Sequence, residues 1–204
     1  MILKIHPINP EERQLLKVIE VLENGGVIII PTDGVYAFAC LLHKTKAAEK
    51  VAQLKGKKLE KADLSFIFDD LSHLAEYTRQ VETWVYKLMK RNLPGPFTFI
   101  LNANTEVPKI FKNNKKTIGI RIPDNKICNE IVRRLQLPLI TASVHDNDEV
   151  VEYTTDPDLI HERWGHIVEL VIDGGYGLNT PSAVLDCTGN ELVVLREGLK
   201  ELEY

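Results

Sequence analysis

The first regular pattern of apolar and polar positions lies near the start of the chain and has helical spacing. The apolar residues between 15 and 22 fall on one helix face, which predicts an amphipathic helix. Asn9 suits the N-cap, Pro10 suits the first helical position, and Glu12 can complete a capping-box-like arrangement. The Gly25-Gly26 pair can end this helix, because glycine readily adopts the left-handed conformation of helix ends.

Continuous apolar runs alternate with further helical patterns. Val27 to Ile30 is apolar throughout and suits a strand covered on both faces, closed by Pro31. We expect further helices at 45–54, 70–77, 80–91 and 127–135, and further strands at 64–68, 97–101, 117–122, 139–143, 167–172, 182–187 and 192–195. Strands mixed with helices predict an α/β or α+β fold in which helices pack against a sheet. The sequence has no repeat, low-complexity segment or composition break, so we expect one domain over 1–204 with its core at about 9–200.

Composition narrows the class of protein further. The chain has 204 residues and a formal net charge of −4, which argues against a dedicated DNA-binding protein but leaves room for a local basic patch. Cys40, Cys128 and Cys187 lie far apart without a CxxC pair, so we interpret them as reduced core thiols of a cytosolic protein. The N-terminal residues lack the apolar segment of a signal peptide, and no apolar run approaches the roughly 20 residues that cross a bilayer. We therefore expect a cytoplasmic protein without a membrane partner.

Two polar segments could carry chemistry. Thr32, Asp33 and Gly34 follow a strand end, where a hydroxyl, a carboxylate and a glycine can contact a substrate closely. An ordinary tight turn is the alternative interpretation. The lysines between 55 and 61 flank Gly56 and could neutralise polyphosphate or a nucleic-acid backbone, although most lysine clusters are simply solvated surface.

The segment 117–123 is the third candidate. In a strand, Thr117, Gly119 and Arg121 point to one face, because successive side chains alternate. A guanidinium facing a cleft is a bidentate partner for carboxylate or phosphate, whereas an exposed sheet arginine is the alternative. Two hydroxyls, those of Thr141 and Ser143, share a face by the same alternation. Ser182 and Arg196 complete the set of candidate residues.

Several common kinds of site find no support in the sequence. There is no GxxxxGK[ST] phosphate loop and no GxGxxG fingerprint. The six histidines are scattered without metal-ligand spacing, and no Ser, His and Asp set has hydrolase context, so we predict no metal site. Four aromatic residues are interpreted as core or helix-packing groups: Tyr77, Trp84, Tyr86 and Trp164.

An ordered set of motifs resembles the YrdC/YciO family. GGVIIIPTDGVYAFAC resembles its opening signature, and LPGPFTFIL, TIGIRIPDN, LPLITASV, PSAVLD and LREG resemble its later segments in family order, from residue 25 to residue 198. The IHP start, the PTDGVYAFAC variant and the closing VVLREG look more like the YciO branch. The resemblance implies an open twisted mixed sheet with flanking helices around a concave, positively charged cleft.

The resemblance also implies an activity. Members of the family make threonylcarbamoyl-AMP from L-threonine, bicarbonate and ATP with Mg²⁺, releasing pyrophosphate, for the threonylcarbamoyl modification of adenosine in tRNA. The chain would then be a nucleotidyltransferase, with tRNA-modification proteins and tRNA or double-stranded RNA as further partners.

Site residues carry over from the resemblance by motif. Those expected at the ATP phosphates and the nucleotide are Lys55, Lys57, Lys61, Thr117, Ser143 and Arg196. Those expected in the threonine pocket are Thr32, Gly34, Arg121, Thr141 and Ser182, and Lys55, Lys57 and Arg121 would be catalytic. The chain departs from the family pattern at four places: Gly34 for threonine, Lys57 for arginine, Asn125 for histidine, and Val144-His145 in place of the alanine and asparagine.

Three hypotheses remain open at this stage. The chain is a threonylcarbamoyl-AMP synthase or an enzyme of closely related chemistry, an enzyme that adenylates another carbamate or carboxylate, or a non-catalytic RNA-binding module. We expect Arg121→Ala to damage substrate binding with little loss of fold.

Overall fold

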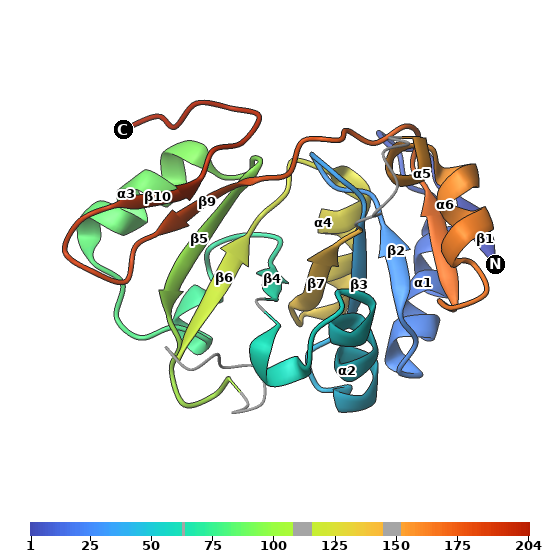
Figure 1. Cartoon of the computed structure of the whole chain (residues 1–204), viewed down its shortest axis with the longest axis horizontal. Helices are drawn as coiled ribbons and strands as arrows, with labels where there is room; N and C mark the ends of the chain where they lie inside the picture. Colours follow the sequence, from blue (N-terminus) through green and yellow to red (C-terminus); the bar gives the residue numbers. More distant parts are fainter. Residues whose placement is uncertain (63, 108–115, 145–151) are drawn as a thin grey trace.

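The strands of the protein form a single mixed sheet, with helices packed against it (Figure 1). The computed structural model describes residues 1–62, 64–107, 116–144 and 152–204. The strands are β1 (Ile2–Lys4), β2 (Ile28–Ile30), β3 (Ala37–Leu41), β4 (Ser65–Ile67), β5 (Phe97–Asn102), β6 (Thr117–Arg121), β7 (Leu139–Ser143), β8 (Leu170–Asp173), β9 (Ala183–Asp186) and β10 (Val193–Arg196). They run in the order β1-β8-β2-β3-β7-β4-β6-β5-β9-β10, with parallel and antiparallel neighbours. The predicted mixed α/β class is confirmed.

Helices flank this sheet on both faces. They are α1 (Glu12–Glu23), α2 (Thr45–Leu54), α3 (Thr83–Asn92), α4 (Lys126–Leu135), α5 (Glu152–Thr155) and α6 (Pro157–Trp164), with 3-10 turns at Leu59–Lys61 and Leu74–Glu76. The helix predicted at 45–54 is confirmed, whereas the one predicted at 70–77 is wrong, since that segment contains only the short turn. Two strands and two helices were not predicted: β1, β3, α5 and α6.

The predicted cap of the first helix is wrong. The N-cap is Glu11, and its side chain makes no capping hydrogen bond. Instead the Glu11 carboxylate accepts from the His6 backbone N–H at 3.2 Å, while His6 Nδ1 accepts from the N–H of Asn9 at 3.1 Å. The Asn9 backbone is therefore used in the turn that precedes the helix, and the Glu12 carboxylate pairs with Arg134.

Two hydrophobic clusters lie on opposite faces of the sheet. On one face, which we call the α4 face, α1 and α4 pack with Leu15, Val18, Ile127 and Ile131 against residues such as Ile28. The opposite face, the α2 face, is covered by α2, α3 and α6, and its cluster contains the side chains of Phe38, Phe66, Phe99, Ile118 and Ile120 among others. The helix positions follow from the apolar stripe that each helix must bury.

One half of the α4 face is not covered by these helices. Over β4, β6, β5 and β9, this face has half-buried positions (Ser65, Gly119, Ile100 and Val184) together with buried polar residues (Thr98, Thr117 and Arg121). Their neighbours on the α2 face are fully buried: Phe66, Ile118, Phe99 and Leu185. The same strands are therefore apolar and buried on the α2 face, and polar and partly exposed on the α4 face.

Cysteines and aromatic residues test two further predictions. Cys40, Cys128 and Cys187 are free and buried, as expected for core thiols. Tyr77 is buried and Trp164 packs edge-on against Phe38 at 5.1 Å between ring centroids. The core interpretation of Trp84 and Tyr86 is wrong, since both are exposed on α3, whose buried face runs through Val85, Leu88, Met89 and Asn92. Among the described residues no helix is long and apolar enough to span a membrane.

Candidate functional site

The register of the sheet brings the strand-borne candidates onto one face. Thr141 opposes Ser65, and Ser65 opposes Gly119, so these three positions form a row across β7, β4 and β6. Directly opposed residues point to the same face, and the strand period is two. Thr117 and Arg121 therefore share the α4 face with Gly119, and Ser143 shares it with Thr141. The predicted alternation of 117–121 is confirmed, and it joins the hydroxyl pair of β7.

A second pair of hydroxyls lies on the other side of β6. Thr98 of β5 and Ser182, just before β9, join through their hydroxyl oxygens at 2.8 Å, and both residues are buried. Thr98 was missed in the sequence although it stands in the LPGPFTFIL segment. The sequence alone could not place Thr98 on this face, because its side is set by the register in which Ile100 opposes Gly119.

A β-bulge turns Arg196 toward this face. Val194 opposes Leu185, and the next paired residue is Arg196, which opposes Val184. Leu195 is therefore the extra residue of the bulge and opposes no residue of β9. In a regular ladder Leu195 would oppose Val184 and Arg196 would point to the α2 face, because a one-residue slip reverses a strand. With the bulge, Arg196 donates Nε and Nη2 to the Ser182 carbonyl oxygen at 3.0 and 2.7 Å.

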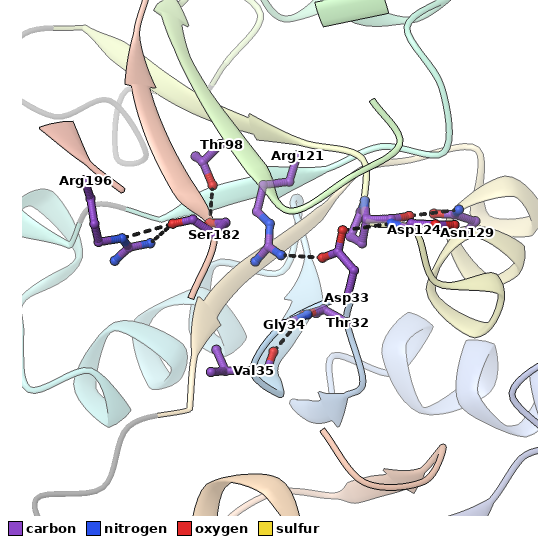
Figure 2. Close-up of polar contacts among 11 residues, drawn as sticks. Thr32, Asp33, Gly34, Val35, Thr98, Arg121, Asp124, Asn129, Ser182 and Arg196 are labelled. Atoms are coloured by element: carbon purple, nitrogen blue, oxygen red, sulfur yellow. Dashed lines mark hydrogen bonds and ion pairs between the residues drawn. The ribbon is translucent and has the colours of Figure 1, made fainter. Parts of the chain in front are cut away.

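Arg121 is buried in the middle of this group (Figure 2). Its side chain is only 5% exposed, and Nη2 donates to Asp33 Oδ1 at 3.1 Å. The other oxygen of Asp33 accepts from the Asp124 backbone N–H at 2.9 Å. Arg121 Nε has no hydrogen-bond partner in the part of the chain that the structure describes. The alternative of an exposed sheet arginine is therefore wrong, and Nε is a buried donor that a water molecule or a ligand could satisfy.

The electrostatics around Arg121 favour an anion. Burial lowers the pKa of the Arg196 guanidinium, and the positive charge of Arg121 lowers it further. The two cations are thus close enough to repel each other, and an anionic ligand between them would relieve that repulsion. Burial raises the pKa of Cys128 to about 12, opposed by Arg121 and reinforced by Asp33. This neighbouring thiol stays protonated at neutral pH and does not serve as a nucleophile.

The loop after β2 is a tight turn with a close neighbour. Thr32 Oγ1 donates to the Val35 carbonyl at 2.7 Å and accepts from the Gly34 N–H at 3.1 Å. A Cβ atom on Gly34 would lie 2.9 Å from the Thr180 carbonyl oxygen, and the Leu178 N–H donates to the Gly34 carbonyl at 3.0 Å. The segment 174–180 therefore packs directly on this turn, and position 34 has no room for a side chain.

Tyr36 fastens the same segment. Its hydroxyl donates to the Gly175 carbonyl at 2.6 Å and accepts from the Gly174 N–H at 3.3 Å. Burial raises the pKa of this phenol above its usual range, so it remains a donor at neutral pH. The hydroxyl therefore satisfies two backbone groups of the segment 174–180, which packs beside Gly34.

We expect Tyr36→Phe to lower the free energy of unfolding by about 1–3 kcal/mol, because two backbone groups lose their partner. Thermal denaturation measures this effect, at about 2–4 °C per kcal/mol for a chain of this size. Tyr86→Phe is the matched control, since Tyr86 is exposed on α3. Equal melting temperatures for the two variants would show that the hydroxyl contacts of Tyr36 contribute nothing.

The predicted lysines lie at and after the C-terminus of α2. Lys55 is the half-buried C-cap of α2, while Lys57 and Lys61 are exposed. Lys57 lines an open cavity of about 410 Å³ whose other lining residues are Glu49, Gln53, Gly56, Lys58 and Leu59. None of the strand-borne candidates lines this cavity. The structure thus groups Arg121, Ser182 and Arg196 directly, and leaves the role of the lysines a prediction.

Asn125 and Val144, two departures from the family pattern, make structural contacts within the fold. Asn125 caps α4, because its side chain accepts from the Cys128 N–H at 3.1 Å. Val144 is buried and donates its N–H to the Tyr36 carbonyl at 2.8 Å. His145 lies outside the described residues. Thr141, a predicted pocket residue, is buried, and its hydroxyl donates to the Ser65 carbonyl oxygen at 3.2 Å. In the described ranges, no group of three or more His, Cys, Asp or Glu residues could hold a metal ion.

An open mixed sheet with two arginines and several hydroxyls on one accessible face defines an α/β protein with a candidate anion site. Comparison with known proteins gives the family. The profile of the Sua5/YciO/YrdC family, described as "Telomere recombination", matches residues 20–198. The chain belongs to this family, as the resemblance of its motifs predicted.

Relatives of similar length support this assignment. The chain is 38% identical to an uncharacterized protein of Haemophilus influenzae over 95% of this chain and 93% of that one. It is 35% identical to the protein YciO of Escherichia coli, over 98% and 96% of the two chains. A putative threonylcarbamoyl-AMP synthase of Methanocaldococcus jannaschii is 32% identical over 97% of this chain and 93% of that one.

Solved structures share the fold. The crystal structure of E. coli YciO superposes with a TM-score of 0.91 at 34% identity, covering 98% of this chain and 97% of that one. P. abyssi Sua5 complexed with L-threonine has a TM-score of 0.85 at 22% identity, covering 97% of this chain and 57% of that one. The predicted YrdC-like architecture and its YciO-like character are confirmed.

Proposed function

We propose that the protein forms an acyl-adenylate from an amino-acid carbamate and ATP, with L-threonine as the amino acid. The observation that carries this proposal is the buried Arg121, whose Nε lacks a partner among the described residues beside a second arginine. A guanidinium with a free donor is suited to a carboxylate, which the substrate amino acid keeps when its amine is carbamoylated. The relative from M. jannaschii, named a putative threonylcarbamoyl-AMP synthase, supports the same chemistry.

The reaction has two bond-forming steps. The threonine nitrogen attacks the carbon of bicarbonate and water is lost, which gives the carbamate. A carbamate oxygen then attacks the α-phosphorus of ATP, the bond from that phosphorus to the bridging oxygen breaks, and pyrophosphate leaves with the electron pair. Positioning of two anions and stabilisation of the leaving charge are the tasks of the protein, and neither requires a covalent nucleophile.

Each group of residues has a part in this scheme. Arg121 binds the threonine carboxylate, with the hydroxyls of Thr141 and Ser182 beside it on the α4 face, and Arg196 faces the nucleotide. The lysines at 55, 57 and 61 hold the phosphates. Mg²⁺ binds mainly through substrate phosphates and keeps several waters, so it enters as part of the nucleotide substrate. The product serves the threonylcarbamoyl modification of tRNA in the cytoplasm.

The test is pyrophosphate release from ATP and Mg²⁺, with threonine and bicarbonate each present or omitted. Release that requires both compounds supports the proposal. ATP binding without release under any of these conditions overturns threonine as the substrate. Absence of both release and ATP binding overturns the enzymatic proposal and favours RNA binding, whose steep salt dependence identifies it.

The surroundings of Gly34 favour a second candidate substrate. Gly34 has no side chain, and the Thr180 carbonyl oxygen lies 2.9 Å from where a Cβ atom would be, so position 34 offers the substrate backbone groups rather than a hydroxyl. A different amino acid could therefore be carbamoylated and adenylated by the same residues. A screen of the standard amino acids in the pyrophosphate assay distinguishes this candidate from threonine.

Lys57→Ala is expected to raise the KM for ATP about tenfold, because one charge-assisted contact to phosphate is lost. Lys58→Ala is the matched control: Lys58 is the next exposed lysine of the same cavity and has no counterpart among the expected phosphate ligands. Its KM for ATP should change less than about twofold. Equal effects of the two substitutions would show that only the general positive charge of the segment matters.

A further inference from the structure

Asp33 occupies an unusual position for a carboxylate in a turn. Its side chain is only 8% exposed, and each oxygen has one donor: Arg121 Nη2 on one side and the Asp124 N–H on the other. These contacts connect the loop after β2 with the loop after β6, which are 88 residues apart for the pair with Arg121. Figure 2 shows the carboxylate between the arginine and Asp124.

We propose that Asp33 is a positioning residue that fixes the Arg121 guanidinium so that its Nε–H faces the carboxylate of the acyl substrate. This inference rests on the function proposed above, because it assigns a task to a residue of the same site. Asp33 does not touch the substrate itself. It acts through Arg121 by occupying one of its donors and leaving another available.

The need for such a residue follows from the charges nearby. Arg121 and Arg196 repel each other, as the lowered pKa of Arg196 indicates after the effect of burial. An arginine side chain has many rotamers, so without a partner Arg121 would turn away from Arg196 and lose its orientation. The Asp33 carboxylate offsets one positive charge and holds the guanidinium at a defined atom, Nη2.

Asp33 can perform this task because it is itself held. The Asp124 N–H donates to it just before α4, and Asn125 fixes the start of that helix by capping Cys128 N–H. On the other side the turn of residues 32–35 is closed by the Thr32 hydroxyl. A site supported by two ordered elements keeps its geometry before the substrate arrives.

Asp33→Asn is the main test variant, because it preserves the size of the side chain and removes its charge. The KM for L-threonine in the pyrophosphate assay should rise about tenfold or more, while the KM for ATP should change less than about twofold. Asp33→Glu should not restore the wild-type KM, since the longer side chain displaces Arg121. Equal increases in both KM values, or an unchanged KM for threonine, would overturn the positioning role.

Glu169→Gln is the matched control. Glu169 also joins a backbone N–H to a cation, accepting from Val27 N at 2.6 Å and from Lys50 Nζ at 2.8 Å. It connects α2 with the start of β8 and is not part of the candidate site. This variant should lose thermal stability and keep its KM for threonine. A rise in that KM equal to that of Asp33→Asn would show that lost stability alone explains both.

A spectroscopic measurement keeps the inference testable if the proposed reaction is wrong. In ¹⁵N-labelled wild-type protein, the Nε–H resonance of Arg121, assigned with Arg121→Lys, should be protected from exchange with water because the group is buried. In Asp33→Asn it should shift and exchange faster, and in Glu169→Gln it should not. Unchanged Nε–H exchange in Asp33→Asn overturns the inference, whether or not pyrophosphate release is observed. No release by the wild-type protein overturns the proposed function alone.

Discussion

Arg121→Lys is expected to raise the KM for threonine about 10- to 100-fold while the protein stays folded. Lysine keeps the positive charge that Asp33 requires, but it loses the planar fork and the Nε donor. The difference corresponds to about 1.4–2.8 kcal/mol of binding free energy. Pyrophosphate release over a range of threonine concentrations measures it, and equilibrium titration of threonine gives an independent value.

Arg121→Ala answers a different question. The sequence led us to expect little loss of fold, and the buried ion pair adds an expected loss of stability. Removing the guanidinium leaves the Asp33 carboxylate buried with one partner fewer, which costs about 3–5 kcal/mol in comparable pairs. The double variant Asp33→Ala/Arg121→Ala should recover part of this stability while threonine binding stays lost. Full threonine affinity in Arg121→Lys or in the double variant would contradict the role of Arg121 in the site.

Gly198→Ala should lower stability through a clash with the backbone of β9. A Cβ atom at this position would lie 2.2 Å from the backbone nitrogen of Ala183 and 2.9 Å from its Cα atom. Backbone atoms cannot move aside as the end of a side chain can, so the segment after β10 must separate from β9. We expect a loss of about 1–3 kcal/mol or more, as for other overpacked sites, and weaker contact between Arg196 and Ser182.

Urea denaturation measures the stability of this variant, and the KM for ATP reports on Arg196. Gly189→Ala is the matched control, because a Cβ atom there meets nothing within 4 Å. It should leave both quantities near their wild-type values. If Gly198→Ala has the same midpoint as the control, the close approach to Ala183 is relaxed in solution and does not hold β10 in place.

Elements with a strong periodic pattern could be predicted from the sequence, and those created by tertiary pairing could not. β7 and α2 were predicted with the bounds observed, since both have a clear apolar pattern between turn residues. β3 was missed because Ala37 to Leu41 contains no β-branched residue, and its strand conformation comes from pairing with β2 and β7 on both sides. β1 has only three residues and depends on its parallel pairing with β8.

The site shows the same division. The facing of Arg121 could be predicted from strand alternation within five residues. Its partner Asp33 could not, because the pair joins a loop to the end of a strand far away in sequence, and local patterns contain no information about such a contact. The inward turn of Arg196 was equally hidden, since it depends on the bulge at Leu195. The motif resemblance predicted both arginines as site residues. The physical reasons for their positions, the ion pair with Asp33 and the bulge at Leu195, are visible only in the three-dimensional structure.

The bulge at Leu195 also affects whether the edge of the sheet can pair with a strand of another molecule. β10 is an edge strand, and Val193, Val194 and Leu195 are 52%, 41% and 56% exposed. Three consecutive apolar residues on a free edge are a template for pairing with a strand of another molecule. A bulge interrupts the regular row of N–H and C=O groups that such a neighbour would need. The extra residue Leu195, which directs Arg196 toward the candidate site, thereby also makes this edge a poorer template for pairing between molecules.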